Sequence, residues 1–135
     1  MTPIGPDWQL LADMRTRGHA DKPAPIALVV PIRIMSEANM RGDGQSKAQR
    51  VKAQRHAVAW AWTAAQWPRN QRPVLVRLVR LASREVDSDN LTGGFKAVRD
   101  EVACLCGFDD RHKGVRWEYA QEQAPGWRCR IEAVW

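Results

Sequence analysis

The order in which two hydrophobic periodicities follow each other along the chain most constrains its fold. Apolar, β-branched or alternating runs predict strands, whereas Ala-rich runs and apolar residues three or four positions apart predict helices. In chain order the predicted elements are a strand at 26–34, a helix at 46–67, a strand at 74–81, a helix through 95–105, and strands at 115–119 and 127–135. This order predicts an α/β fold in which a small mixed or antiparallel sheet of about four strands packs with two main helices.

Local residues refine three of these elements. Pro31 removes a backbone donor from the first strand, so we expect that strand at an edge of the sheet or at a bulge. Pro125-Gly126 separates the last two strands, which alternate in polarity and are expected to close as an antiparallel hairpin. The second helix leaves Lys96 off its apolar face. That face is predicted from Phe95, Val98, Val102 and Leu105.

The length of 135 residues suits one domain that buries its core without disulfides or a structural metal. Residues 25–135 are predicted to form this domain. Residues 1–24 are predicted to be an N-terminal extension with a short amphipathic helix at 7–17, and residues 41–45 a glycine-containing loop.

Two features predict the compartment. No stretch approaches the ~20 apolar residues that span a bilayer, and the first residues lack a basic region followed by an apolar one. We therefore expect no membrane partner and a cytoplasmic location. Cys104, Cys106 and Cys129 are odd in number and lack Cys-x-x-Cys spacing, so we expect reduced thiols in the core or at its boundary.

Basic residues are concentrated between residues 41 and 84 of a chain whose net charge is +6. This concentration predicts a positive face that attracts nucleic acid by neutralising phosphates. The alternative is a solvated surface that keeps the protein soluble. The basic residues of this segment are Arg41, Lys47, Arg50, Lys52, Arg55, Arg69, Arg72, Arg77, Arg80 and Arg84. The residues predicted to contact DNA are Arg41, Lys47, Arg50, Lys52, Arg55 and Arg84.

Seven tryptophans suggest stacking on bases as a possible use of the aromatic side chains. Four of them, however, lie on apolar faces of predicted elements and are expected in the core or in a dimer interface. These four are Trp62, Trp117, Trp127 and Trp135.

An acidic cluster follows the second predicted strand. In an extended segment Asp87 and Asp89 would share one face and could hold one ion, with Asp109 or Asp110 as a ligand from a separate element. Mg²⁺ prefers such oxygen ligands, usually one or two carboxylates plus water and phosphate. The alternative is that these residues are helix caps and solvated turns. The cluster therefore predicts either a metal site or local turn chemistry.

The run D-S-D-N-L…K-A-V-R-D-E-V…G-F-D-D over residues 87–110 resembles the signature of the RusA family of Holliday-junction resolvases, which are common in phages and prophages. The likeness extends weakly to residues 36–41 and does not cover residues 1–24. The family member that we compare has two residues between Asn and Lys, whereas five residues separate Asn90 from Lys96 here. We expect Thr92-Gly93-Gly94 to be a looped insertion, after which the helix realigns with that of the family.

The resemblance implies a RusA-like fold and a metal-dependent endonuclease that cuts four-way DNA junctions in recombination and repair. By this resemblance Asp87, Asp89 and Asp110 are the catalytic aspartates and hold Mg²⁺ or Mn²⁺, and Lys96 is the catalytic lysine. It also implies a homodimer, because paired nicks need two sites.

Two further residues are expected to support this site, and two other functions stay open. Asn90 and Asp109 would orient the ligands.

The first alternative function is that of a phage protein that keeps the RusA fold and binds nucleic acid without cutting it. The second is an acidic turn that only binds another protein.

Overall fold

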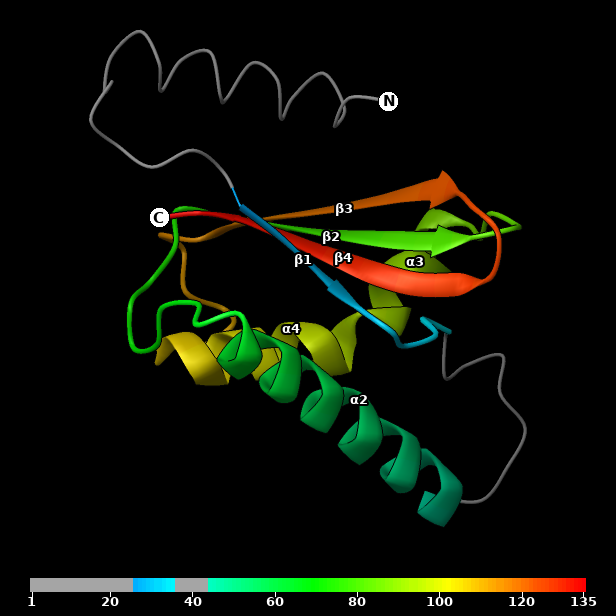
Figure 1. Cartoon of the computed structure of the whole chain (residues 1–135), viewed down its shortest axis with the longest axis horizontal. Coiled ribbons are helices and arrows are strands. Elements are labelled where there is room, and N and C mark those ends of the chain that lie inside the picture. Colours follow the sequence, from blue (N-terminus) through cyan, green and yellow to red (C-terminus); the bar gives the residue numbers. More distant parts are fainter. Residues whose placement is uncertain (1–25, 36–43) are drawn as a thin grey trace, which may run out of the picture.

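A four-stranded mixed sheet with helices on one face forms the described part of the chain (Figure 1). The computed structural model describes residues 26–35 and 44–135. The strand order is β1 (Ile26–Val30), β4 (Trp127–Val134), β2 (Leu75–Ala82) and β3 (Arg116–Gln123). The helices of this part are α2 (Gly44–Ala64), α3 (Ser88–Gly94) and α4 (Lys96–Cys106). The α/β class and the four strands are confirmed, and α3 adds a helix that the periodicities did not predict.

Some predicted segments lie outside the described residues. They are the extension 1–24 with its helix at 7–17, the segment 36–41 of the family likeness, and residues 41–43 of the predicted loop. The helix predicted at 46–67 is α2, which already includes Gly44 and ends at Ala64. Within residues 26–35 and 44–135, no helix combines the length and the apolar composition that crossing a membrane requires.

The last two strands do not form the predicted hairpin. β3 pairs with β2 in parallel, and β4 pairs with the other edge of β2 in antiparallel orientation. The turn between β3 and β4 crosses the end of β2, where Ala124 N donates to Ala82 O at 3.0 Å. Alternating polarity identifies strands but not their partners. β2 takes the central position because its apolar residues are buried on both faces of the sheet.

β1 occupies the edge that its proline predicts. It pairs only with β4 in this sheet, in antiparallel register from Ile26↔Ala133 to Val30↔Cys129. The strand ends at Val30, directly before Pro31, and is therefore shorter than the predicted 26–34. The edge position is confirmed, and the proline sets its end because it cannot donate to the ladder.

The core lies between the sheet and the helices. Val58 and Trp62 of α2 are fully buried, as are Val98 and Val102 of α4. The apolar face predicted for α4 is therefore confirmed, and Lys96 at its first position is exposed.

The tryptophans divide between the core and the surface. Trp62, Trp67 and Trp135 meet edge to face, with ring centroids 4.8 Å apart for Trp62 and Trp67 and 5.5 Å apart for Trp67 and Trp135. Trp117 is half-buried and carries the Arg99 guanidinium 4.5 Å from its ring centroid. Trp127 does not lie in the core, because it begins β4 directly after an exposed turn and is 52% exposed. For Trp127 the dimer interface stays a prediction.

All three cysteines are free, in agreement with the expectation of reduced thiols. Cys106 and Cys129 are buried, and burial raises the pKa of each thiol to about 12. Both therefore stay protonated at neutral pH. Cys104 is exposed on α4, so its expected place in the core or at its boundary was wrong.

The predicted looped insertion at Thr92-Gly93-Gly94 is instead the last part of α3. Gly94 is buried there, and a Cβ atom at this position would lie 2.9 Å from Ile34 Cγ2 and 3.2 Å from the backbone carbon of Met35. The loop prediction was wrong because glycine at this point serves a close approach between α3 and the segment after β1.

We expect Gly94→Ala to lower the free energy of unfolding by about 1–3 kcal/mol, because the added methyl group meets both a side chain and backbone atoms. Urea denaturation measures this change. Gly93→Ala is the matched control at an exposed position of the same turn, and it should be neutral or stabilise by up to ~1 kcal/mol. Equal stability of Gly94→Ala and the wild type would contradict the described packing of α3.

Candidate functional site

Asp87 caps α3 and does not lie in an extended pair with Asp89. Asp87 Oδ1 accepts a hydrogen bond from the backbone N–H of Asn90 at 2.9 Å. Asp89 lies in the first turn of α3 and is exposed. The helix-cap interpretation is therefore confirmed for Asp87, and the shared extended face was wrong. The bond comes from the Asn90 backbone, so the supporting role of the Asn90 side chain stays a prediction.

Asp109 and Asp110 lie after α4 and have different basic partners. Asp109 is exposed and pairs with Arg111, whose Nε lies 3.3 Å from Asp109 Oδ1. The Arg111 hydrogen bonds lower the pKa of the Asp109 carboxyl to about 2. Asp110 is half-buried, and its Oδ2 lies 3.5 Å from Arg99 Nε. Asp110 is thus the aspartate that the fold holds in place.

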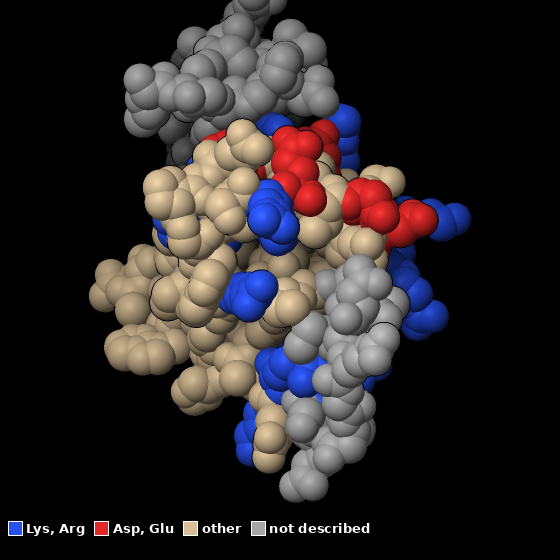
Figure 2. Space-filling model, turned by 90° about the vertical axis from the view of Figure 1, so that its right-hand side faces the viewer, with Lys and Arg blue, Asp and Glu red and all other residues tan. Residues whose placement is uncertain are grey.

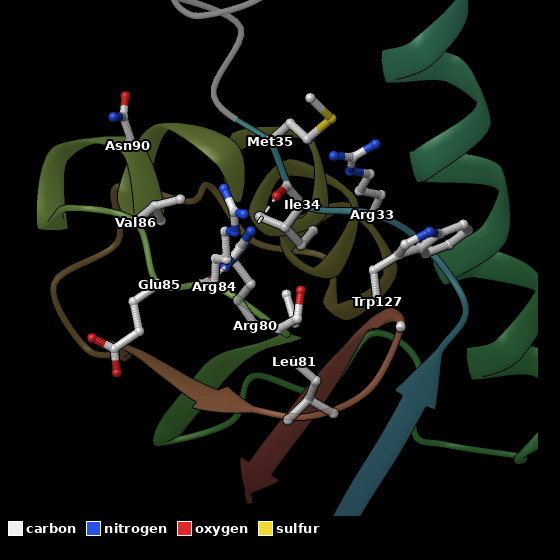
Figure 3. A pocket seen from close by; sticks show the side chains of 13 residues that line it. Arg33, Ile34, Met35, Arg80, Leu81, Arg84, Glu85, Val86, Asn90 and Trp127 are labelled. Carbon is white, nitrogen blue, oxygen red and sulfur yellow. Dashed lines mark hydrogen bonds between the residues drawn. The ribbon is translucent and has the colours of Figure 1, made fainter.

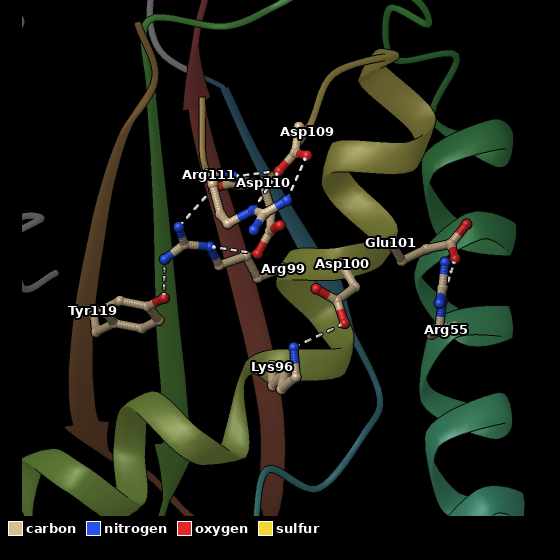
Figure 4. A network of polar contacts seen from close by, with 9 residues as sticks. All are labelled: Arg55, Lys96, Arg99, Asp100, Glu101, Asp109, Asp110, Arg111 and Tyr119. Atoms are coloured by element: carbon tan, nitrogen blue, oxygen red, sulfur yellow. Dashed lines mark hydrogen bonds and ion pairs between the residues drawn. The ribbon is translucent and has the colours of Figure 1, made fainter. Parts of the chain in front are cut away.

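Arg99 connects α4, β3 and the loop between them (Figure 4). Its Nη1 donates to the Tyr119 hydroxyl at 2.8 Å, and its Nη2 donates to the Asp110 carbonyl at 2.7 Å. The guanidinium also lies over the Trp117 ring. These contacts from three directions fix the Asp110 backbone relative to α4. Sequence patterns marked Arg99 only as a residue off the apolar stripe.

One hollow brings together several of the predicted residues, and we call it the acid hollow (Figure 4). Its volume is about 490 Å³. Lys96 Nζ lies 3.5 Å from Asp100 Oδ2, one helical turn further along α4. The residues that line it are Lys96, Asp100, Ala103, Cys104, Phe108, Asp109, Asp110 and Arg111. Lys96 and Asp110 therefore face the same hollow, whereas Asp87 and Asp89 do not line it.

The acid hollow offers carboxylate oxygens, which a hard cation prefers, but fewer of them than a metal site built from protein side chains alone would need. In the described ranges no three His, Cys, Asp or Glu side chains converge closely enough to hold a metal ion. Mg²⁺, however, needs only one or two carboxylates when water and a substrate phosphate complete its shell. Asp110 and Asp100 supply such carboxylates beside Lys96. Sequence reasoning did not select Asp100, although its spacing of four from Lys96 on one helix was a usable signal.

The predicted DNA-contacting residues have different environments. Lys47 and Lys52 of α2 are exposed. Arg55 donates from Nε to Glu101 at 2.8 Å, which raises the pKa of Arg55 and ties α2 to α4. Arg84 lines a separate cavity beyond β2, and Arg41 lies outside the described residues. Arg50 lines a hollow between α2 and the segment after β1.

A groove of about 190 Å³ continues from the acid hollow toward α2. Lys96 and Asp100 line both spaces, and Lys47 borders the groove from α2. Gly93 and Gly94 form its floor on the α3 side. The groove thus places Lys47 of α2 next to the acid hollow, where its charge can neutralise a phosphate of a strand that lies in the groove.

The cavity that Arg84 lines was not predicted, and we call it the arginine cavity. It lies beside α3 (Figure 3). Its volume is about 360 Å³. Arg33, Arg80 and Arg84 line it together with Asn90 and Trp127. Figure 2 looks at this end of the molecule, where acidic side chains gather in the upper part of the view and basic ones extend below and beside them. The basic segment predicted from sequence included Arg80 and Arg84, but Arg33 joins them only through the fold.

Comparisons with known proteins give no family for this chain. No protein-family model matches the chain, and no curated protein matches it. The likeness of residues 87–110 to the RusA signature therefore stays a prediction, and the function is argued from the site.

Proposed function

We propose that this chain is a metal-dependent endonuclease that nicks branched DNA, as its resemblance to RusA resolvases implies. One observation carries the proposal: Lys96, Asp100 and Asp110 line a hollow that continues into a groove bordered by Lys47 of α2. Carboxylates beside a cation suit a metal-bound phosphate, and the basic border suits the rest of the backbone. The RusA-like fold is part of the same proposal.

Asp110 is the first candidate for holding the ion, with Asp100 or Asp109 as a second carboxylate from the same hollow. A bound Mg²⁺ or Mn²⁺ would polarise the scissile phosphate and activate water. Asp87 and Asp89 stay predicted ligands, although α3 presents them outside the acid hollow. The pairing of Arg99 with Asp110 keeps the carboxylate in one orientation before the substrate arrives.

Lys96 supplies the mobile positive charge of the site. Its side chain is 77% exposed, and its ammonium lies 3.5 Å from Asp100 Oδ2. An exposed ion pair of this kind is weak, so the ammonium can leave Asp100 for a nearby phosphate at little cost. There it would stabilise the negative charge that develops as the phosphodiester bond breaks.

A nicking assay on a synthetic four-way junction tests the proposal. With Mg²⁺ or Mn²⁺ the full chain should nick the junction in pairs, and with EDTA it should bind without nicking. A linear duplex of the same sequence is the control and should be cut far less. Analytical ultracentrifugation of the same preparation should show a dimer, because paired nicks need two sites.

A second function, nucleic-acid binding without cleavage, is favoured by a different observation. Each carboxylate in the acid hollow already has a basic neighbour, namely Lys96, Arg99 or Arg111. Such pairs stabilise the hollow without an ion and compete with metal binding. Junction binding that is unaffected by divalent ions, with no nicking at any metal concentration, would favour this second function. Absence of DNA binding would leave only the protein-binding alternative.

We expect Lys96→Ala to lower the nicking rate about 10²-fold or more while the junction affinity changes little, because the lost charge acts mainly on the transition state. Single-turnover nicking and an anisotropy titration measure the two quantities. Lys113→Ala is the matched control, since Lys113 is an exposed lysine outside the acid hollow. If both variants nick at the wild-type rate, Lys96 has no catalytic role.

A further inference from the structure

The arginine cavity concentrates positive charge at the end of the sheet near α3. Arg80 and Arg84 lie together in its middle, and Arg33 enters from the segment after β1 (Figure 3). Glu85 is the only acid among the described residues that line the cavity, and its carboxylate points away from the arginines in this view. Among the described residues, neither Arg33 nor Arg84 has an ion-pair partner for its side chain. The cavity therefore attracts an anion.

Backbone hydrogen bonds hold the Arg80 side chain in place at the inner end of the arginine cavity. Its Nε donates to the Ile34 carbonyl at 3.1 Å and its Nη1 donates to the Arg84 carbonyl. Burial lowers the pKa of the Arg80 guanidinium, and the charge of Arg33 lowers it further. A guanidinium stays protonated in spite of such shifts. Its positive charge is thus held at the inner end of the cavity by backbone carbonyls, and no carboxylate of residues 26–35 or 44–135 pairs with it.

An apolar hollow of about 320 Å³ adjoins the arginine cavity. Arg33, Met35 and Trp127 line both spaces, and the Trp127 ring extends toward α2 (Figure 3). Pro31, Ile32 and Ala53 complete the apolar part of the hollow. An exposed tryptophan over an apolar floor offers a stacking surface of the kind that single-stranded DNA uses. The two adjoining spaces therefore combine a site for an anion with a site for a flat ring.

We propose that the arginine cavity and its apolar neighbour bind one unpaired nucleotide of a DNA strand, with the phosphate held by Arg33 and Arg84 and the base stacked on Trp127. The inference rests on the proposed function, since it names the feature of the DNA that the protein recognises: a strand that leaves its duplex. A fully paired duplex keeps its bases stacked inside and cannot offer one to Trp127.

The location of this nucleotide site suits a strand that continues to the acid hollow. The apolar hollow shares Met35 and Gln54 with the groove beside α2, and that groove shares Lys96 and Asp100 with the acid hollow. Because neighbouring spaces share lining residues, a DNA strand can run without interruption from the arginine cavity to the acid hollow. Unpaired nucleotides at a branch would thus fix the position of the scissile phosphate.

Fluorescence anisotropy with a labelled 12-nucleotide oligo-dT and with a 12-base-pair duplex tests the nucleotide site in the full chain. Trp127→Ala should weaken oligo-dT binding about 5- to 150-fold, the loss expected for one stacked base. Its duplex affinity should change less than about twofold. Trp127→Phe should retain most of the oligo-dT affinity, because the aromatic face remains.

The double variant Arg33→Gln/Arg84→Gln should lower the slope of log affinity against log salt for oligo-dT by at least about 0.7, the value for one phosphate on a single strand. Arg116→Gln is the matched control, because Arg116 is an exposed arginine at the start of β3, away from both spaces. It should leave the slope unchanged. Thermal denaturation checks that every variant is folded.

Three outcomes would overturn the proposal. They are equal loss of duplex and oligo-dT binding in Trp127→Ala, an unchanged salt slope in the double arginine variant, and competition by poly-glutamate at the same charge concentration as oligo-dT. The nicking assay of the wild type is read separately. If the wild type never nicks but the variants lose oligo-dT binding, the nucleotide site is retained and the nuclease is refuted. If the wild type nicks and the variants bind oligo-dT as the wild type does, the nuclease is retained and the nucleotide site is refuted.

Discussion

Asp110→Asn is expected to lower the rate of metal-dependent nicking about 10³-fold or more, because a metal-bound phosphate depends on several kcal/mol of charge stabilisation. The fold should survive, since the Asp110 carbonyl keeps its hydrogen bond from Arg99 Nη2. Junction affinity should be unchanged or higher, because one negative charge near the phosphate is gone. Single-turnover nicking at saturating Mg²⁺ and anisotropy titration measure the two effects.

Two matched variants make this result specific. Asp109→Asn removes the neighbouring carboxylate, which is exposed and paired with Arg111, and should lower the rate only about 10- to 100-fold. Asp89→Asn distinguishes between a metal site that includes the aspartates of α3 and one formed by the carboxylates of the acid hollow alone. It should abolish nicking if α3 contributes a ligand, and leave most of the rate if the acid hollow holds the ion alone. Wild-type nicking by Asp110→Asn would refute the proposed site.

Glu132→Ala is expected to lower the free energy of unfolding by about 3–5 kcal/mol, the usual cost of removing one partner from a buried ion pair. Glu132 is fully buried on β4, where its Oε2 accepts from Arg130 Nε at 2.8 Å and its Oε1 lies 3.9 Å from Arg77 Nε. Without Glu132, the Arg77 side chain, which is only 15% exposed, would lose its carboxylate partner. Urea denaturation measures the loss.

The control for this variant is Glu85→Ala, which removes an exposed glutamate and should change the free energy of unfolding by no more than about 0.5 kcal/mol. A loss below about 1 kcal/mol in Glu132→Ala would mean that the sheet tolerates an unpaired Arg77. Such a result would contradict the described burial of this pair.

The pH dependence of the free energy of unfolding independently reports how burial affects the Glu132 carboxyl. Burial raises the pKa of Glu132 above the ordinary value of a glutamate, although Arg130 and Arg77 oppose the shift. The folded state thus binds the proton more tightly than the unfolded state. The contribution of this group to stability is complete below the unfolded-state pKa and is lost as the pH rises through the folded-state pKa. Glu132→Gln should therefore remove this decline from the stability profile.

The strands illustrate how far local patterns predict a fold. Pro31 predicted an edge strand because a missing backbone donor limits pairing in any sheet. The Pro125-Gly126 break predicted a hairpin, but the strands on either side of it pair with β2 instead. Pairing depends on which strand can be buried on both faces, and this is a property of the whole sheet. A turn signal alone therefore identifies a reversal of the chain and not a partner.

By itself the sequence determined the four strands, the two long helices and the chemistry available to this protein, but not α3. The apolar face of α4, the exposed Lys96 and the free cysteines follow from residue types and spacing, which act over one or two turns. Only the tertiary structure decided which charged groups meet. It placed Asp110 with Asp100 rather than with Asp87, and it brought Arg33 to Arg84. The physical reason is that Arg33 and Arg84 come from segments distant in sequence, whose approach is set by sheet order and helix packing, and that Asp110 reaches Asp100 through the turn after α4 rather than through helical spacing.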